Sequence, residues 1–166
     1  INTIYDTKFK HNPFLNEEPF KSIKDRAFKR ASSMISDQQL FDLIQFIKMT
    51  KNVKGNVVEY GSLYGGSGAI LAESLNFFGK KNLFLFDSFS GIPKSKYGLD
   101  YCWDGAFSDN SESMVKNSFS DLSNVEVIPG NITKTYKKVE GPFSFVYLAS
   151  DTLESGEIIM NYAWPR

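Results

Sequence analysis

Cysteine and histidine are nearly missing from this chain of 166 residues, which has one of each, Cys102 and His11. A single cysteine excludes an internal disulfide and a multi-cysteine metal site, and it fits a reducing compartment. The lone histidine falls in an irregular N-terminal segment, so the sequence indicates no Ser-His-Asp or Cys-His catalytic site. Any chemistry must come from glycines, carboxylates, amides and hydroxyls.

An excess of charge and a long apolar run are missing as well. Nineteen basic residues balance nineteen acidic ones, so the chain has no field that would attract nucleic acid or anionic lipid. No apolar stretch approaches the roughly 18 residues that a membrane span needs, and the first residues lack the pattern of a secretion signal. We expect a cytoplasmic protein that binds neither nucleic acid nor membranes. The aromatic-rich N-terminal segment could also cover an acceptor site or contact a second copy of the chain.

Apolar periodicity divides the sequence into an N-terminal cap and one α/β domain. Residues 1–35 show no sustained period, and we expect an irregular cap with one short helix. Ser36 and Gln39 have the spacing of a capping box, and apolar residues then recur on one helical face. Residues 36–166 are expected to form the ligand-binding domain.

Strands and helices alternate within that domain. A strand at 56–60 leads into a glycine loop, a helix that Gly79 ends, and a second strand at 82–86, which is the order of a βαβ unit. A long loop at 88–110 precedes another helix. Three more strands are expected, at 125–129, 143–149 and 157–161. The pattern predicts the α/β class, with a doubly wound, mostly parallel sheet.

The strongest motif is the glycine loop that joins the first strand to its helix. Glycines let the backbone turn sharply beside a ligand, and a helix N-terminus offers free N–H groups to a carboxylate or hydroxyl. A glutamate at the strand end suits a ligand ammonium and repels phosphate, and the spacing fits neither the dinucleotide nor the Walker pattern. The loop predicts a ligand site formed by Glu59, Gly61, Tyr64, Gly65 and Ser67. A purely structural turn is the alternative.

Polar residues follow the second and third strands. Asp87 ends the second strand, where a carboxylate can accept hydrogen bonds from both hydroxyls of a ribose, with Ser88 beside it. Asn131 follows the third strand, and its amide could contact an adenine edge. Asp87 could instead be a turn or cap residue, and Asn131 also lies in a glycosylation sequon.

Taken together, these residues resemble the macrocin O-methyltransferase family. The resemblance lies in residues 57–67, in the Phe-Asp-Ser-Phe-Ser-Gly-Ile-Pro segment at 86–93 and in residues 156–165, and extends from about Ser36 to the end. It implies a class I methyltransferase fold, here incomplete on its C-terminal side. It also implies S-adenosylmethionine as cofactor and methyl transfer to a hydroxyl of a small molecule, a sugar of a natural product or glycan.

The resemblance further implies a metal-assisted reaction. In the family, Asp-x-Asp and Asp-Asp-Tyr motifs end the last two of these strands and bind a divalent cation such as Mg²⁺. Here Ala149 and Met160 stand in two of the carboxylate positions. Asp151 remains as ligand or catalytic base and Asn161 as a second ligand, which is an incomplete set for octahedral Mg²⁺.

Two other functions stay open. The two replaced carboxylates favour a catalytically inactive homologue that binds the cofactor and acts as a partner or regulator. An unrelated α/β module that binds another nucleoside, such as NAD or ATP, is the third alternative, and the position of Glu59 argues against it.

The connection between the last two expected strands is too short. Seven residues separate Ala149 from Glu157, whereas a parallel crossover takes about a dozen. Three explanations are open: residues omitted after Asp151, a lost crossover helix, or a hairpin of the two strands.

Overall fold

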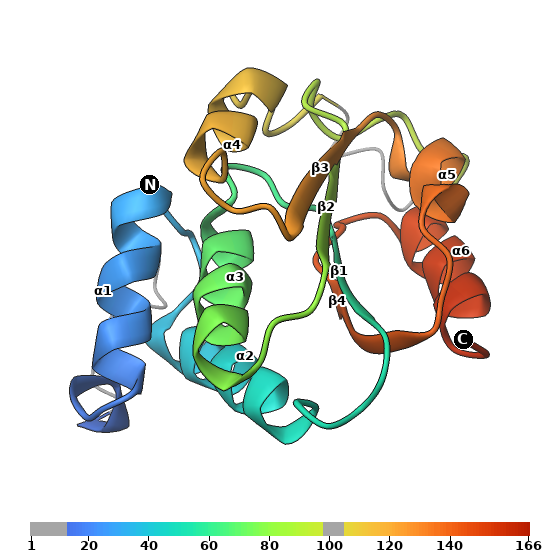
Figure 1. Cartoon of the computed structure of the whole chain (residues 1–166). Coiled ribbons are helices and arrows are strands. Elements are labelled where there is room, and N and C mark those ends of the chain that lie inside the picture. Colours follow the sequence, from blue (N-terminus) through green and yellow to red (C-terminus); the bar gives the residue numbers. More distant parts are fainter. Residues whose placement is uncertain (1–12, 98–104) are drawn as a thin grey trace.

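Four parallel strands form a sheet at the centre of the structure, in the order β3-β2-β1-β4 (Figure 1). The computed structural model describes residues 13–97 and 105–166. The strands are β1 (Asn56–Tyr60), β2 (Leu83–Asp87), β3 (Val125–Pro129) and β4 (Phe143–Leu148). Because β1 pairs with β2 on one side and with β4 on the other, the strand order reverses at the β1/β4 boundary, where α/β sheets bind ligands. The predicted doubly wound fold is confirmed.

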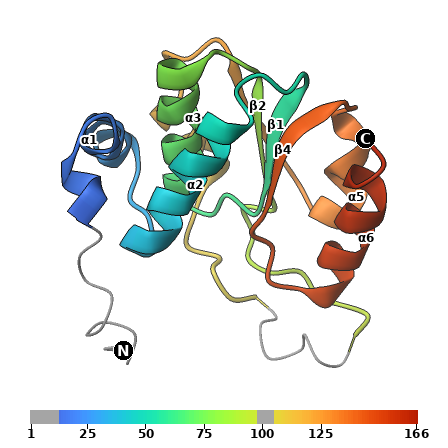
Figure 2. The same ribbon diagram turned by 90° about the horizontal axis from the view of Figure 1, so that it is seen from below.

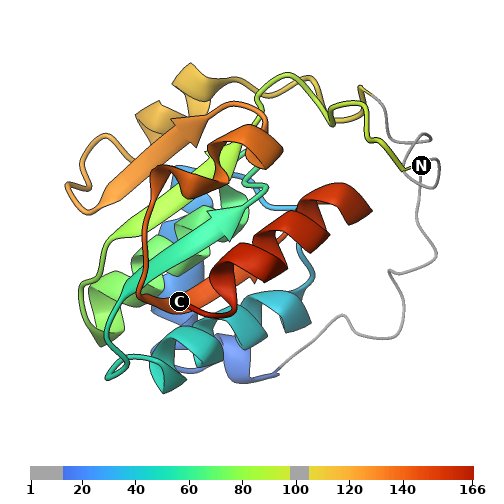
Figure 3. The ribbon, with the colours of Figure 1, turned by 90° about the vertical axis from the view of Figure 1, so that its right-hand side faces the viewer.

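Helices cover both faces of the sheet (Figure 2). One face carries α2 (Asp37–Met49), α3 (Gly66–Phe78) and α4 (Glu112–Ser118). Helix α1 (Phe20–Arg30) packs on the outside of α3, farther from the sheet. The other face, seen in Figure 3, carries α5 (Ile132–Thr135) and α6 (Leu153–Ala163). Short 3₁₀ turns at Pro13–Asn16 (η1) and Tyr136–Lys138 (η3) precede α1 and follow α5.

Alternation along the strands sends side chains into two apolar clusters. Val57 and Leu85 belong to the cluster under α1, α2 and α3, whereas their neighbours Val58 and Phe86 belong to the cluster under α5 and α6. All four are fully buried. A sheet buried on both faces explains why its strands are nearly continuous apolar runs in the sequence.

The first two helices form as their sequences indicate. The short helix expected in the N-terminal segment is α1, which buries Phe20, Ile23 and Ala27 on one face. At the start of α2 the Ser36 Oγ accepts from the Gln39 N–H, and the Gln39 side chain accepts from the Ser36 N–H. The predicted capping box is therefore confirmed.

The strand expected at 157–161 is wrong, because this segment lies within helix α6. Thr152 caps that helix, its Oγ1 accepting from the Ser155 N–H, and Ser155, Ile159 and Tyr162 are buried at helical spacing. The short apolar run at 158–160 fits either period, and the cap decides in favour of a helix. The sheet thus has four strands among the described residues rather than five. No second strand follows β4 among these residues, so the explanation by a hairpin is wrong. The short segment after Ala149 connects a strand to a helix, and it needs no crossover.

Part of the long loop is described. Residues 88–97 and 105–110 form neither helix nor strand, as expected, whereas Cys102 lies outside the described residues, as does His11. In the described part of the chain, every helix is too short or too polar to cross a membrane.

Candidate functional site

A cavity of about 410 Å³ opens at the carboxyl ends of the four strands. The loops after all four strands line it, together with the connection between α1 and α2 and the first turn of α6. Its volume is within the range of small-molecule sites, and its position is the switch point of the sheet. Most of the site residues predicted from the sequence line this cavity, and a few do not.

Two glycines of the loop after β1 are required by close approaches. Gly61 has φ of +101°, and a Cβ there would lie 2.6 Å from the Ala149 carbonyl oxygen at the end of β4. A Cβ on Gly66 would lie 2.2 Å from the Ser32 carbonyl oxygen. Both residues line the cavity. The glycine pattern therefore lets β4 and the α1–α2 connection close against the loop.

Glu59 is fully buried and lies behind the cavity wall rather than in it. The Ser67 hydroxyl, which does line the cavity, donates to Glu59 Oε1, and Glu59 Oε2 has no hydrogen-bond partner among the described residues. Burial, only partly offset by the Ser67 hydrogen bond and reinforced by the charge of Asp87, raises the pKa of Glu59 to about 8. In this structure Glu59 is connected to the cavity through Ser67 and does not line it.

Asp87 lines the cavity and also shapes it. Its Oδ2 accepts from the Leu63 N–H at 2.7 Å, and its Oδ1 accepts from the Phe89 N–H at 2.9 Å. Next to it, the Ser88 Oγ donates to the Gly91 carbonyl oxygen and also lines the cavity. The Asp87 carboxylate thus joins the loops after β1 and β2, and its remaining lone pairs can still accept from a ligand diol.

Two of the three remaining predicted loop residues line the cavity. Asn131 lines the cavity and caps α5, its Oδ1 accepting from the Thr133 N–H at 2.9 Å. Tyr64 lines the cavity, and a hydrogen bond to Asp109 raises its pKa. Gly65 is the left-handed N-cap of α3 and is not among the lining residues.

Asp151 lines the cavity just beyond β4. Desolvation, and after it the charge of Asp87, raise the pKa of its carboxyl. The Tyr147 side chain faces the same cavity, and desolvation raises its pKa with smaller contributions from Glu59 and Asp151. Asp87 and Asp151 therefore face one cavity, with Glu59 behind its wall.

Asn161 is separated from this group. It lies on α6 with an exposed side chain and is not among the residues that line the cavity. In residues 13–97 and 105–166, no three His, Cys, Asp or Glu side chains gather into a metal site. Asp151 and Asn161 consequently do not form the oxygen cage that Mg²⁺ requires.

The charge of the cavity limits its ligands. Its lining has the carboxylates of Asp87 and Asp151 and, among the described residues, no Lys, Arg or His. A ligand rich in phosphate would bring further negative charge against these groups without a counter-ion. A neutral or positively charged ligand is compatible with them.

Some lining residues were not identified from the sequence. Ser32–Ile35, between α1 and α2, form one wall of the cavity, and no periodic pattern marked that segment as functional. Ser62 is buried, and its Oγ has no partner within the described part of the chain. Phe107, in the loop between β2 and α4, lines the cavity as well.

Comparison with protein families gives one match. The family model described as macrocin O-methyltransferase (TylF) matches residues 7–136, which is most of the chain. The match begins before Ser36 and ends before β4, so the expected extent was wrong and residues 156–165 lie outside it. A search among curated proteins found no match.

Several solved structures have the same fold. The O-methyltransferase NovP is 22% identical with a TM-score of 0.70, over 80% of this chain and 62% of NovP. The calicheamicin methyltransferase CalS11 is 13% identical with a TM-score of 0.64, over 90% of this chain and 74% of CalS11. A putative caffeoyl-CoA O-methyltransferase from Staphylococcus aureus is 16% identical with a TM-score of 0.54, over 86% of this chain and 60% of that protein. These likenesses establish the class I methyltransferase fold, and this chain spans less than two thirds of the length of NovP.

Proposed function

The chain belongs to the macrocin O-methyltransferase family, and from this membership we propose that it binds S-adenosylmethionine in the cavity and methylates a hydroxyl of a small molecule, a sugar. The observation that carries the proposal is the convergence of Gly61, Ser67 and Asp87 on one cavity at the switch point of the sheet. The glycine loop and the strand-end acid were independent signals in the sequence. Their meeting in space fits a ligand with an amino-acid part and a ribose.

The residues present fit that cofactor. The loop at 61–67 would hold the amino-acid part, Asp87 the ribose hydroxyls, and Asn131 the adenine edge, with Ser88 and Tyr64 on the wall beside them. The buried Ser62 hydroxyl without a partner is available to the same ligand. The cofactor has a positively charged sulfonium group. Among the described residues, the only charged side chains in the cavity lining are carboxylates, which attract such a charge.

When bound, S-adenosylmethionine supplies an electrophilic methyl group on a sulfonium centre, which becomes a neutral thioether as the acceptor oxygen takes the methyl group. The contribution of this chain would be to receive the proton of the acceptor hydroxyl. Asp151 is the cavity carboxylate that the cofactor loops leave free, and its raised pKa makes it a stronger base than an ordinary aspartate. The donor set does not fit Mg²⁺, and no step is assigned to a metal.

Isothermal titration with S-adenosylhomocysteine, in the presence and absence of Mg²⁺, tests the cofactor part. We expect micromolar binding that Asp87→Asn weakens and that Mg²⁺ does not change. Glu126→Gln is the matched control, since Glu126 is an exposed strand carboxylate on β3 that does not line the cavity. No binding by the folded protein would contradict the proposal, and tighter binding of NAD or ATP would favour a different nucleoside module.

Methyl transfer from S-adenosylmethionine to a panel of neutral sugar glycosides tests the catalytic part. Turnover that Asp151→Asn abolishes while cofactor binding persists would support the proposed reaction. Cofactor binding without turnover on any acceptor would instead support a cofactor-binding homologue without catalysis, the role that Ala149 and Met160 first suggested.

A further inference from the structure

One wall of the cavity does not belong to the sheet. Ser32–Ile35 line the cavity from the connection between α1 and α2, and the Ser32 carbonyl lies directly over Gly66 at the start of α3. This segment, called here the Ser32–Ile35 wall, has no strand pairing to hold it. Ile35, at its C-terminal end, packs against the apolar cluster under α1, α2 and α3. The position of the N-terminal end, at Ser32, therefore depends on how the end of α1 is held.

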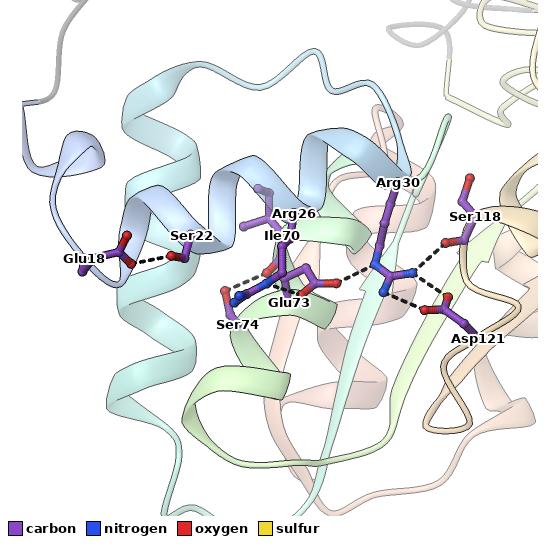
Figure 4. Close-up of polar contacts among 9 residues, drawn as sticks. All are labelled: Glu18, Ser22, Arg26, Arg30, Ile70, Glu73, Ser74, Ser118 and Asp121. Carbon is purple, nitrogen blue, oxygen red and sulfur yellow. Dashed lines mark hydrogen bonds and ion pairs between the residues drawn. The ribbon is translucent and has the colours of Figure 1, made fainter.

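A buried acid on α3 pairs with two arginines of α1 (Figure 4). Glu73 is 3% exposed, and its two oxygens accept from the two arginines of α1, Oε2 from Arg26 Nε at 2.9 Å and Oε1 from Arg30 Nε at 2.5 Å. An acid buried to this degree requires such partners, because an unpaired buried charge is costly. The two ion pairs thus fix the position of α1 along α3, in addition to the apolar packing between the two helices.

Arg30 extends the contact to a third segment. Its Nη1 and Nη2 donate to both oxygens of Asp121 at 2.6 and 2.9 Å, and Nη1 also donates to the Ser118 carbonyl oxygen at 3.2 Å. The hydrogen bond to Asp121, opposed by burial and reinforced by Glu73, raises the pKa of Arg30 above its usual value. A bidentate guanidinium of this kind fixes direction as well as distance.

The two arginines differ in one respect that matters for the cavity. Arg30 is the last residue of α1, two residues before Ser32, whereas Arg26 lies one turn earlier and its side chain is 47% exposed. The apolar contacts of α1, made by Phe20, Ile23 and Ala27, also lie before Arg30. Beyond Ala27, the end of the helix from which the wall departs is held by the partly buried methyl group of Ala31 and by the hydrogen bonds and ion pairs of the Arg30 side chain.

We propose that Arg30, clamped between Glu73 and Asp121, is a positioning residue that holds the Ser32–Ile35 wall against α3 and so keeps the cavity in its ligand-binding shape. Arg30 touches no ligand in this account, and it acts through the wall. The inference rests on the proposed function where it concerns cofactor affinity. The position of the wall itself is a property of the ligand-free protein.

The experiment compares Arg30→Gln with Arg26→Gln, because both remove an arginine from Glu73 and only one loosens the end of α1. Affinity for S-adenosylhomocysteine is measured by titration. Amide hydrogen exchange of residues 31–35 is measured without ligand, with the Ala31 and Ile35 N–H groups as reporters, because they donate to the Ala27 carbonyl and to Ser33 Oγ. If the wall spends about nine tenths of its time away from α3, the apparent affinity falls about tenfold. We expect that loss and faster exchange in Arg30→Gln, and less than about a threefold loss with unchanged exchange in Arg26→Gln.

Arg30→Lys is the control for loss of the fold, because it keeps a positive charge next to Glu73. We expect it to recover part of the affinity and part of the protection at residues 31–35. Equal affinity losses in Arg26→Gln and Arg30→Gln, or unchanged exchange at the wall in Arg30→Gln, would overturn the inference. If the parent protein does not bind S-adenosylhomocysteine, the proposed function fails, and the exchange comparison still decides whether Arg30 positions the wall.

Discussion

The two sides of the cavity are built differently. On the β1/β2 side, polar groups bind one another: buried Ser67 donates to buried Glu59, and half-buried Asp87 accepts from the N–H groups of Leu63 and Phe89. On the β4 side, Asp151 has an exposed side chain and is followed by helix α6. The first side has a shape that exists before any ligand arrives, which suits a cofactor common to many reactions. The second is open, which suits an acceptor whose identity varies.

Gly61 is the point at which the two sides meet, and replacing it should have the largest effect. Gly61→Ala combines an unfavourable positive φ with a collision against the Ala149 carbonyl at 2.6 Å. We expect the free energy of unfolding to fall by about 4 kcal/mol, measured by urea denaturation. Gly156→Ala is the control, since a Cβ there meets no atom within 4 Å and lies inside α6. It should raise stability by about 0.5–1 kcal/mol.

The next largest effect is a change of stability with pH, and its main source is Glu59 on the β1/β2 side. Burial raises the pKa of Glu59 to about 8, well above that of an ordinary glutamate, so the folded protein holds a proton that the unfolded chain has already released at lower pH. Stability should then fall as pH rises from about 4.5 to about 8, by a few kcal/mol in total. Urea denaturation at pH 5.5 and pH 8.5 measures this difference.

Glu59→Gln provides the matched variant for that measurement. A neutral amide can still accept from the Ser67 hydroxyl, so the fold is kept while the titrating group is removed. The fall in stability between the two pH values should become small. A fall of the same size in both proteins would show that another group titrates, and would remove the account of Glu59 as a buried, protonated acid.

The β1/β2 side was the more predictable one. A short strand, a glycine loop and a capped helix are consecutive in sequence, so their spacing was enough to place Gly61, Ser67 and Asp87 at one edge of the sheet. The spacing could not predict how deeply each side chain is buried. Glu59 and Ser67 were both expected at the ligand, and only packing around β1 decides that Glu59 lies behind Ser67.

The β4 side was predicted less well, for a physical reason. The apolar run at 158–160 is too short to distinguish a strand from a helix, and the capping signal, Thr152 with Ser155, consists of two hydroxyl residues rather than the Ser and Gln that marked α2. The Ser32–Ile35 wall had no local signal either. Its position depends on ion pairs between α1 and α3 that lie 43 and 47 residues apart in sequence.

Asp87→Asn and Asp151→Asn compare the two sides directly. Asp87→Asn leaves an amide group against the N–H of Leu63 or Phe89, and we expect affinity for S-adenosylhomocysteine to fall by about 2 kcal/mol, roughly 30-fold. Asp151→Asn should change that affinity by less than about threefold and lower methyl transfer by about 100-fold. Titration and initial-rate measurements on both variants give the two quantities. Equal losses of affinity in the two variants would contradict the division of the cavity into a cofactor side and an acceptor side.

Asn161→Ala should have the smallest effect, and it tests whether the β4 side extends onto the outer face of α6. The Asn161 side chain is exposed and does not line the cavity, so its removal should change the free energy of unfolding by less than about 0.5 kcal/mol. Methyl transfer and its response to added Mg²⁺ should stay the same, because a residue on this face cannot share a cation with Asp151 in the cavity. A loss of activity that high Mg²⁺ restores would mean that Asn161 reaches the reacting atoms in a conformation in which α6 has turned. The open side of the cavity would then be completed by a movement of that helix.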